Sequence, residues 1–228
     1  MSTLLLGHRG DPEHHAENTM ASFLAAIACG ADGVELDVQV SADGVPVVMH
    51  DDTVDRTTSG RGRVDAHTWQ QLGALGVPRL EDVLVALRGH AVAVELKPAC
   101  DARPRLAAQV LDLARRLDVA ATLWLLAFDH RHLAAARRHD VAAWTAALVR
   151  ERPDHPVAVV EACAASALAC WWEHVDATLH DALQRAGRGL LAWTVDTEDD
   201  ALRLTGLGVT GLISNRPCAL LPRLRRRQ

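Results

Sequence analysis

The stretch Gly33-Val34-Glu35-Leu36-Asp37-Val38-Gln39-Val40 combines an apolar strand pattern with two acidic side chains. Glu35 and Asp37 are two residues apart, and alternate side chains of a strand point to the same face, so both carboxylates lie on one face. Two carboxylates inside an apolar strand repel each other unless a cation or a proton lies between them. The stretch therefore predicts a buried strand that carries acidic groups into a polar site.

Similar short apolar runs recur along the chain, with helical patterns between them. The turn Ser41-Ala42-Asp43-Gly44 predicts a hairpin to the arm Val45–His50, because Asp-Gly is a strong hairpin signal. The other predicted strands are Thr3–Gly7, Ala91–Leu96, Thr122–Ala127, Val141–Ala146, a weak Ala167–Cys170, Leu190–Val195 and Gly211–Ser214. The predicted helices are Thr19–Cys29, Leu80–Leu87, Arg103–Leu117, His132–His139, Asp176–Ala186 and Asp199–Gly206.

Strands that alternate with helices indicate βαβ units around a parallel sheet. Without the hairpin arm there are eight strands, which predicts one α/β domain over residues 1–228: a TIM (β/α)8 barrel with a short insertion after the second strand, at about 51–78. The alternative is a doubly wound open sheet, which usually carries G-x-G-x-x-G after its first strand. Gly7-His8-Arg9-Gly10 stands at that place, and it does not favour a dinucleotide site.

Composition narrows the class of protein. The net charge is −5, which argues against a general nucleic-acid binder. The sequence lacks the apolar run of about 18 residues that membrane insertion needs. Its first residues do not resemble a signal peptide, so we expect a cytoplasmic protein.

We expect reduced thiols, without a disulfide framework or a zinc site, at the five scattered cysteines: Cys29, Cys100, Cys163, Cys170 and Cys218.

Charged residues gather where the predicted strands end. Glu95, in the strand Ala91–Leu96, joins Glu35 and Asp37 at the same end of the sheet. Three carboxylates suit one hard divalent cation, Mg²⁺ or Ca²⁺, which prefers oxygen ligands. The alternative is a set of buried ion pairs without a metal, such as Glu95 with Lys97.

Two histidines are predicted at this same end. His8 follows the first strand and His50 closes the hairpin arm, and imidazoles can pass protons in both directions near neutral pH. Arg9 and Lys97, together with a metal, would form an electrophilic clamp for a phosphoryl group. This combination indicates the cleavage of a phosphodiester.

The chain resembles the glycerophosphodiester phosphodiesterase family over nearly its whole length. The motifs that carry the resemblance occur in the family's order: Gly7-His8-Arg9-Gly10, Glu17-Asn18-Thr19, Glu35-Leu36-Asp37-Val38, His50-Asp51, Arg56-Thr57-Thr58, Glu95-Leu96-Lys97, Trp193-Thr194-Val195 and Gly211-Leu212-Ile213-Ser214-Asn215-Arg216-Pro217.

The resemblance implies a TIM barrel that uses one divalent cation to hydrolyse small glycerophosphodiesters to glycerol 3-phosphate and an alcohol. It implies these roles for the site residues: His8 and His50 as the acid/base pair, Glu35, Asp37 and Glu95 as metal ligands, Arg9 and Lys97 on the phosphate, and Trp193 at the pocket wall. Nothing in the residues fixes which histidine is the acid; we expect His50 to be the acid and His8 the base. The alcohol headgroup, the choice between Mg²⁺ and Ca²⁺ and the oligomeric state stay open.

The chain departs from the family's pattern at two places. The excursion after the second strand is short and ends at Pro78-Arg79-Leu80-Glu81-Asp82, which predicts a more open site. Ala127-Phe128 stands where the family has Ser-Phe, so one polar contact is expected to be missing. Arg56 either stabilises its loop or binds an anionic substrate, and Asn18 or Thr19 is expected to cap the helix that follows.

Two other functions fit parts of the pattern. A lysophospholipase D or sphingomyelinase D-like lipid phosphodiesterase would need an apolar rim for an acyl chain. A non-catalytic phosphate-binding barrel would be expected to have lost a histidine or a metal ligand, and the chain retains all of them.

Overall fold

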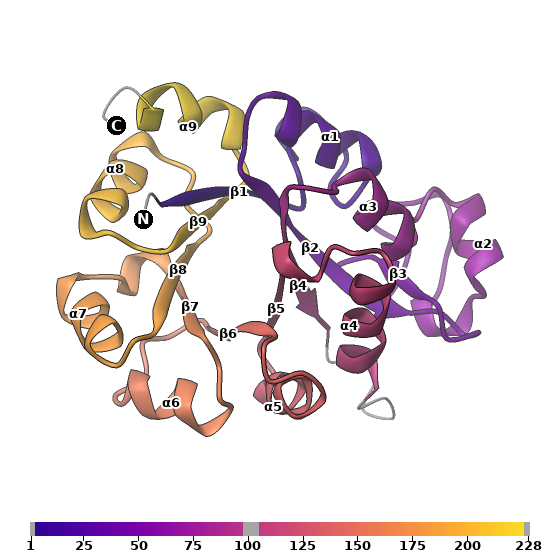
Figure 1. Ribbon diagram of the computed structural model, residues 1–228. Coiled ribbons are helices and arrows are strands. Elements are labelled where there is room, and N and C mark those ends of the chain that lie inside the picture. The colour runs from indigo at the N-terminus through magenta and orange to yellow at the C-terminus, as the bar shows by residue number, and fades with distance from the viewer. Residues whose placement is uncertain (1–2, 98–104, 226–228) are drawn as a thin grey trace.

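The computed structural model describes residues 3–97 and 105–225. Within these residues, eight parallel strands form a closed ring, because the first strand pairs with both the second and the last (Figure 1). The predicted TIM barrel is therefore confirmed. The barrel strands are β1 (Leu4–His8), β2 (Gly33–Val40), β4 (Ala91–Leu96), β5 (Leu123–Ala127), β6 (Trp144–Val149), β7 (Ala167–Trp171), β8 (Gly189–Trp193) and β9 (Gly211–Ser214).

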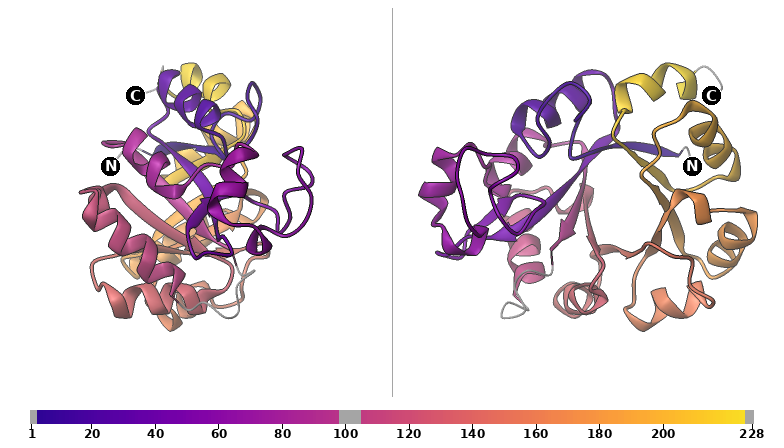
Figure 2. Two further views of the ribbon diagram at one scale, coloured as in Figure 1. Left: turned by 90° about the vertical axis from the view of Figure 1, so that its right-hand side faces the viewer. Right: turned by 180° about the vertical axis from the view of Figure 1, so that it is seen from behind.

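Helices connect the strands and cover the outside of the barrel, as the views from front and back show (Figures 1 and 2). None of the described helices has the length and apolar character needed to cross a membrane. The covering helices are α1 (Met20–Ala28), α3 (Leu80–Ala86), α4 (Leu106–Arg116), α5 (His130–His139), α6 (Pro156–Ala162), α7 (Ala177–Arg185), α8 (Glu198–Leu207) and α9 (Pro217–Leu224). Short 3-10 turns lie at η2 (Ala120–Thr122) and η3 (Trp172–His174).

The apolar side chains form two layers, one inside the barrel and one between strands and helices. Most of the outer layer is Leu, Val and Ala, as the low aromatic content requires. Inside the barrel, Trp124 and Trp144 stack at the start of β5 and β6 with ring centroids 4.3 Å apart. These rings lie toward the amino-terminal end of the barrel, away from the carboxyl ends of the strands.

The strand register brings the acidic strand beside its polar neighbours. His8 of β1 is the partner of Glu35 in β2, and Asp37 of β2 is the partner of Glu95 in β4. Glu35 is thereby level with the carboxyl end of β1, and Asp37 is level with the carboxyl end of β4. That end is where barrels of this class place their chemistry.

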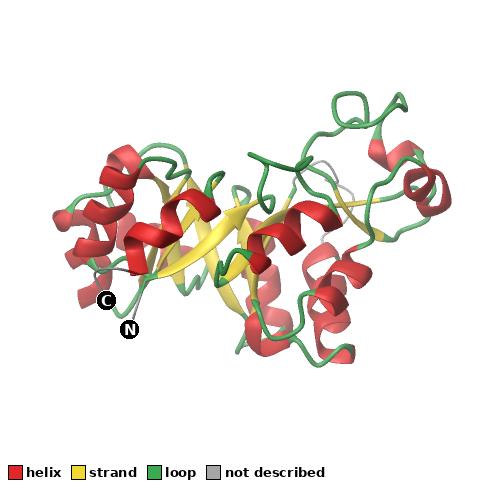
Figure 3. Ribbon diagram, turned by 90° about the horizontal axis from the view of Figure 1, so that it is seen from above, coloured by secondary structure: helices red, strands yellow, loops and turns green. Residues whose placement is uncertain are grey.

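The excursion after β2 projects beyond the ring of helices on one side (Figure 3). It begins with β3 (Pro46–Val48), which pairs antiparallel to β2 as the hairpin signal predicts. It continues through η1 (Val64–Ala66) and α2 (Trp69–Ala74). It has a small core of its own, formed by Val47, Met49, Val54, Val64, Leu72 and Val77.

Several predicted boundaries differ from the structure. The strand expected at Val141–Ala146 begins only at Trp144, because the run from Val141 to Val149 is apolar apart from Thr145 and periodicity cannot locate a strand within it. Val141 itself is 79% exposed. Helices α6 and α9 were not predicted; each begins with a proline in its first turn, where the missing N–H costs nothing.

The expectation that all cysteines are reduced is wrong for two of them. Cys29, at the end of α1, and Cys218, in α9, form a disulfide although 189 positions separate them in sequence. Closure of the barrel brings its first and last helices together, and sequence spacing cannot reveal this. Cys163 and Cys170 are buried free thiols, as expected, while Cys100 lies outside the described residues.

We expect this disulfide to contribute about 2–5 kcal/mol to the free energy of unfolding, because it joins the two ends of the chain and restricts the unfolded state. Dithiothreitol should lower the urea midpoint of the wild-type protein to that of the Cys29→Ala/Cys218→Ala variant. It should not change the midpoint of the variant. A wild-type midpoint that does not respond to dithiothreitol would contradict the bond.

Candidate active site

Three carboxylates meet at the junction of β2 and β4. One oxygen each of Glu35, Asp37 and Glu95 lies within 4.8 Å of the others. Asp37 is completely buried and Glu35 is 3% exposed. The sequence-based prediction that these three side chains converge therefore agrees with their positions.

Two cations neutralise part of this negative charge. Lys97 Nζ lies 2.6 Å from Glu95 Oε1 and 2.8 Å from Asp37 Oδ1. Arg9 Nε lies 3.2 Å from Asp37 Oδ2. Three carboxylates therefore face two cations, and among the described residues neither cation's side chain forms an ion pair with Glu35.

The electrostatics follow from this imbalance. Burial raises the pKa of Glu35 well above its ordinary value, and the neighbouring charges of Asp37 and Glu95 raise it further. Burial and Asp37 also raise the pKa of Glu95, against the opposing effect of Lys97. Burial opposes the ionisation of Asp37 too, but Lys97 and Arg9 outweigh it and lower the pKa of Asp37.

The turn after β1 is shaped around Glu35. Arg9 has a left-handed backbone, with φ of 57°, which a residue with a side chain seldom adopts. This turn lets the Arg9 N–H donate to the Glu35 carbonyl oxygen at 2.8 Å, and the same N–H lies 3.3 Å from Glu35 Oε2. Gly10 follows with φ of 92°, and a Cβ there would meet Ser22 at 2.4 Å, so only glycine fits.

His8 is oriented by two polar residues from the other end of the chain. Its Nδ1 lies 2.6 Å from Asn215 Oδ1, just after β9. The Asn215 amide nitrogen donates to Asp196 Oδ2 at 2.8 Å, so Asn215 Oδ1 accepts and His8 Nδ1 carries the proton. This leaves Nε2 of His8, 3.9 Å from Glu35 Oε2, as the nitrogen that can accept a proton. Burial, together with Arg9, lowers the pKa of His8.

His50 is held by a carboxylate instead. Its Nδ1 lies 2.6 Å from Asp51 Oδ1, and hydrogen bonds from Arg56 help to lower the pKa of Asp51 to about 2. Gln39, on the same face of β2 as Asp37, donates to the His50 carbonyl oxygen at 3.3 Å and fixes the loop. The two histidines thus have different partners, a neutral amide for His8 and an anion for His50.

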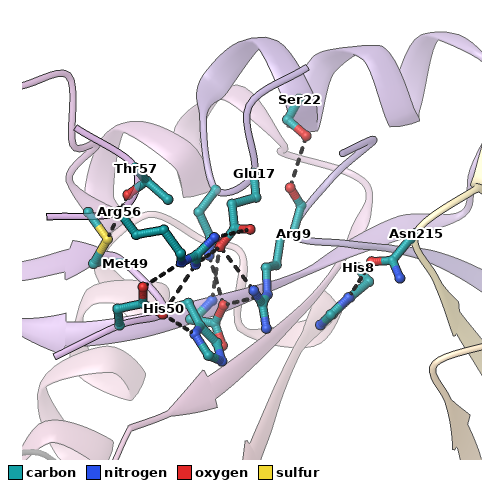
Figure 4. A network of polar contacts seen from close by, with 12 residues as sticks. His8, Arg9, Glu17, Ser22, Met49, His50, Arg56, Thr57 and Asn215 are labelled. Carbon is teal, nitrogen blue, oxygen red and sulfur yellow. Dashed lines mark hydrogen bonds and ion pairs between the residues drawn. The ribbon is translucent and has the colours of Figure 1, made fainter. Parts of the chain in front are cut away.

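A chain of ion pairs links the excursion to the barrel (Figure 4). Arg56 Nε lies 2.6 Å from Asp51 Oδ2, and Arg56 Nη2 lies 2.6 Å from Glu17 Oε1. Glu17 Oε1 in turn accepts from Arg9 Nη1 at 2.9 Å. Of the two roles expected for Arg56, the structure therefore shows loop stabilisation.

Asn18, two positions before α1, has a role that the sequence did not reveal. Thr19 caps the helix, since its side chain accepts from the Ser22 N–H, as one of the two expected caps. Asn18 points elsewhere, and its amide nitrogen donates to Asp37 Oδ2 at 2.7 Å. Asn18 thus occupies one oxygen of the buried carboxylate.

A cavity of about 450 Å³ opens over these groups, which is a typical volume for a small-molecule site. His50 belongs to it, but no described residue of the excursion from 51 to 78 does, in line with the open site that the short excursion predicts. Asp37 lies beneath it. The lining residues are His8, Arg9, Glu35, His50, Glu95, Lys97, Leu126, Phe128, Leu148, Arg150, Trp193, Thr194 and Ile213.

The donor set fits a hard divalent cation. All three convergent groups offer carboxylate oxygens, the ligands that Mg²⁺ and Ca²⁺ prefer. Asp37 Oδ1 is buried and, within the described chain, accepts no hydrogen bond of ordinary geometry despite its ion pair with Lys97. A second group, Asp11, Glu13 and His14, has similar spacing, but Glu13 and His14 are exposed.

Comparison with known proteins gives the family. A family model described as the glycerophosphoryl diester phosphodiesterase family matches residues 8–219. The chain belongs to this family. As a member, the protein is an enzyme of the phosphoric diester hydrolase class.

The similarity to individual relatives covers nearly the whole chain. The chain is 29% identical to a glycerophosphodiester phosphodiesterase of Caldanaerobacter subterraneus subsp. tengcongensis, over 99% of each protein. A crystal structure of a glycerophosphodiester phosphodiesterase from Agrobacterium tumefaciens superposes with a TM-score of 0.85 at 27% identity, over 96% of this chain and 99% of the other. A phosphodiesterase of Oleispira antarctica, solved with its product sn-glycerol-3-phosphate, has the same fold: TM-score 0.88, 24% identity, 98% and 97% coverage.

Sequence reasoning missed some of the polar residues of the site. Asp196, Asn215 and Arg150 all follow strand ends at the mouth of the barrel, which is the signal that could have identified them. The partners of Asn18 and Asp51 could not be read in this way, because a hydrogen bond across the fold leaves no local pattern.

We expect Glu35 to destabilise the metal-free protein at neutral pH. Its folded pKa lies above the unfolded value, so its contribution to the free energy of unfolding decreases as pH rises from about 4.5 toward that raised pKa. Metal-free Glu35→Gln should therefore be more stable than wild type at pH 7.5, and the difference should shrink at pH 5. Calcium or magnesium should raise the melting temperature of wild type but not of Glu35→Gln.

The matched control for this experiment is Glu13→Gln, which changes the exposed acidic group. This variant should keep the metal-induced rise in melting temperature. If Glu13→Gln loses that rise and Glu35→Gln keeps it, the metal assignment to Glu35, Asp37 and Glu95 is wrong.

Proposed function

We propose that the protein hydrolyses glycerophosphodiesters to glycerol 3-phosphate and an alcohol, with a divalent cation and two histidines. The observation that carries this proposal is the shared cavity, in which a triad of buried carboxylates faces two imidazoles whose Nδ1 atoms are already bound. The family relationship supports the substrate class.

Glu35, Asp37 and Glu95 would hold the cation, Mg²⁺ or Ca²⁺. When bound, it would neutralise charge on the phosphoryl oxygens and make a substrate hydroxyl more acidic. Arg9 and Lys97 line the cavity beside this triad and would contact the phosphate, since charged donors form strong hydrogen bonds with phosphoryl oxygens.

His8 is the better candidate for the base. Its partner is a neutral amide, and its lowered pKa keeps the ring neutral at pH 7, with Nε2 able to accept a proton. We propose that His8 removes the proton from the 2-hydroxyl of the glycerol. The resulting alkoxide then attacks phosphorus and forms a cyclic phosphate.

His50 is the better candidate for the acid. The Asp51 carboxylate accepts from its Nδ1 and orients the ring, so that Nε2 would give a proton to the leaving alcohol. In the second half of the reaction the roles reverse: His50 takes a proton from water as the water opens the cyclic phosphate, and His8 returns its proton to the 2-oxygen. Trp193 would form a wall of the cavity beside the substrate.

The described surface gives little support to a lipid substrate. The large apolar residues that are exposed there are Leu24 on α1, Val85 on α3 and Val141 before β6. None of them lines the cavity, and the apolar residues that do line it are buried or only partly exposed: Leu126, Phe128, Leu148, Trp193 and Ile213. The proposal of a cytoplasmic location is also weakened, because the bond between Cys29 and Cys218 favours an oxidising compartment.

The function is tested with glycerophosphoglycerol and with an analogue in which hydrogen replaces the 2-hydroxyl of both glycerol units. Mg²⁺ or Ca²⁺ should support hydrolysis of the intact substrate to glycerol 3-phosphate, and EDTA should abolish it. The deoxy analogue lacks the attacking hydroxyl and should react at least 100-fold more slowly. Normal turnover of the analogue would eliminate the cyclic phosphate, whereas full activity in EDTA would eliminate the metal.

Substrates whose leaving groups differ in their need for a proton distinguish the roles of the two histidines. Alanine at His8 or His50 should each reduce hydrolysis of glycerophosphoglycerol by about 10²–10⁴-fold. With a glycerophospho-nitrophenyl ester, whose leaving group needs no proton, His50→Ala should recover most of the lost rate of nitrophenolate release. His8→Ala should not recover. The opposite pattern would mean that the acid and base are exchanged.

A further inference from the structure

Arg150 is a cavity residue that the proposed reaction does not use. It directly follows β6, which lies across the ring of strands from β1. It lines the same cavity as His8, His50 and Lys97. The cavity thus has a reacting side at β1, β2 and β4, and a second side at β5, β6 and β8.

Two aromatic rings hold the Arg150 guanidinium in place. Its Cζ lies 5.3 Å from the ring centroid of Phe128 and 5.9 Å from that of Trp193, within the range of a cation–π contact. Trp193 is itself fixed, because its Nε1 donates to the Ala169 carbonyl oxygen at 3.1 Å and its ring packs edge-on against Trp171. The arginine is therefore positioned by its aromatic neighbours.

The donor edge of Arg150 has no acidic partner in the chain as described, residues 3–97 and 105–225. The nearby carboxylates pair elsewhere: Glu151 Oε2 lies 3.1 Å from His174 Nε2, and Asp129 Oδ2 lies 2.6 Å from Arg131 Nη2. Arg9 and Lys97, the other cations of the cavity, both pair with Asp37. Arg150 is thus the cavity cation whose charge the described residues leave uncompensated.

We propose that Arg150 binds a second anionic group of the substrate, a carboxylate or a phosphate on the leaving alcohol. The inference rests on the proposed function. With the scissile phosphate and the 2-hydroxyl at the carboxylate triad, the part of the substrate left to reach β6 is the alcohol. A guanidinium forms paired hydrogen bonds with either kind of anion.

The same geometry disfavours a cationic headgroup. A quaternary ammonium binds to aromatic faces, but the guanidinium already covers the rings of Phe128 and Trp193. Its positive charge also repels a second cation. Choline esters should therefore be poor substrates.

The test compares four glycerophosphodiesters whose alcohols differ in charge: glycerol (neutral), glycerate (carboxylate), glycerol phosphate (phosphate) and choline (cation). We expect wild-type kcat/KM for at least one anionic substrate to exceed that for the neutral one by about ten- to a hundredfold, the effect of a charged hydrogen bond. The choline ester should be the slowest. The glycerate and phosphate arms decide which anion the site takes.

Arg150→Gln should bring the ratio of anionic to neutral kcat/KM close to one. The matched control is Arg152→Gln, which removes a charge two residues away that pairs with Asp176 and lies outside the cavity lining. This control should keep the wild-type ratio and activity. A wild-type ratio near one, a preference for choline, or an unchanged ratio in Arg150→Gln would overturn the proposal.

Binding of the same four compounds in EDTA, measured by calorimetry, separates this proposal from the proposed function. If none of them is hydrolysed with metal present, the proposed function fails. The anion site then stands only if wild type binds an anionic compound at least tenfold more tightly than the neutral one and Arg150→Gln does not. Equal binding by both proteins overturns it.

Discussion

The structure depends on the compensation of three buried carboxylates by two cations. Parallel pairing of β2 with β4 sets Asp37 beside Glu95, and Lys97 bridges both at 2.6–2.8 Å. Isolated charges at such depth are costly, and Arg9 and Lys97 offset much of this cost by pairing with the carboxylates. The compensation is incomplete at Glu35, and this residual charge is what a divalent cation would neutralise.

From this centre, polar contacts order the rest of the mouth. Arg9 leads through Glu17 and Arg56 to Asp51, which orients His50 and ties the excursion to the barrel. On the other side, Asn215, which directly follows the last strand, orients His8 and is itself held by Asp196. Both histidines are therefore positioned by segments far away in sequence, and closure of the barrel is a condition for the arrangement.

Much of this could be predicted from sequence because the strands of a barrel carry local signals. The period-two spacing of a strand predicts that Glu35 and Asp37 share one face. The alternation of eight strands with helices predicts the closed barrel. The contacts that cross the fold could not be predicted. Asn18 looks like a helix cap until Asp37 is seen beside it, Arg150 needs the rings of Phe128 and Trp193, and the disulfide joins helices that only the closed barrel brings together.

The central claim is that the acidic centre at β2 and β4 is a metal site that works on a phosphate. The most direct measurement is a crystal structure with Mn²⁺ and glycerol 3-phosphate, with the ion located by anomalous scattering. The account predicts one ion bound by oxygens of Glu35, Asp37 and Glu95 at about 2.0–2.6 Å, with the phosphate against Arg9 and Lys97. An ion found only at the second group, Asp11, Glu13 and His14, with the β2–β4 carboxylates still paired only to Arg9 and Lys97, would contradict it.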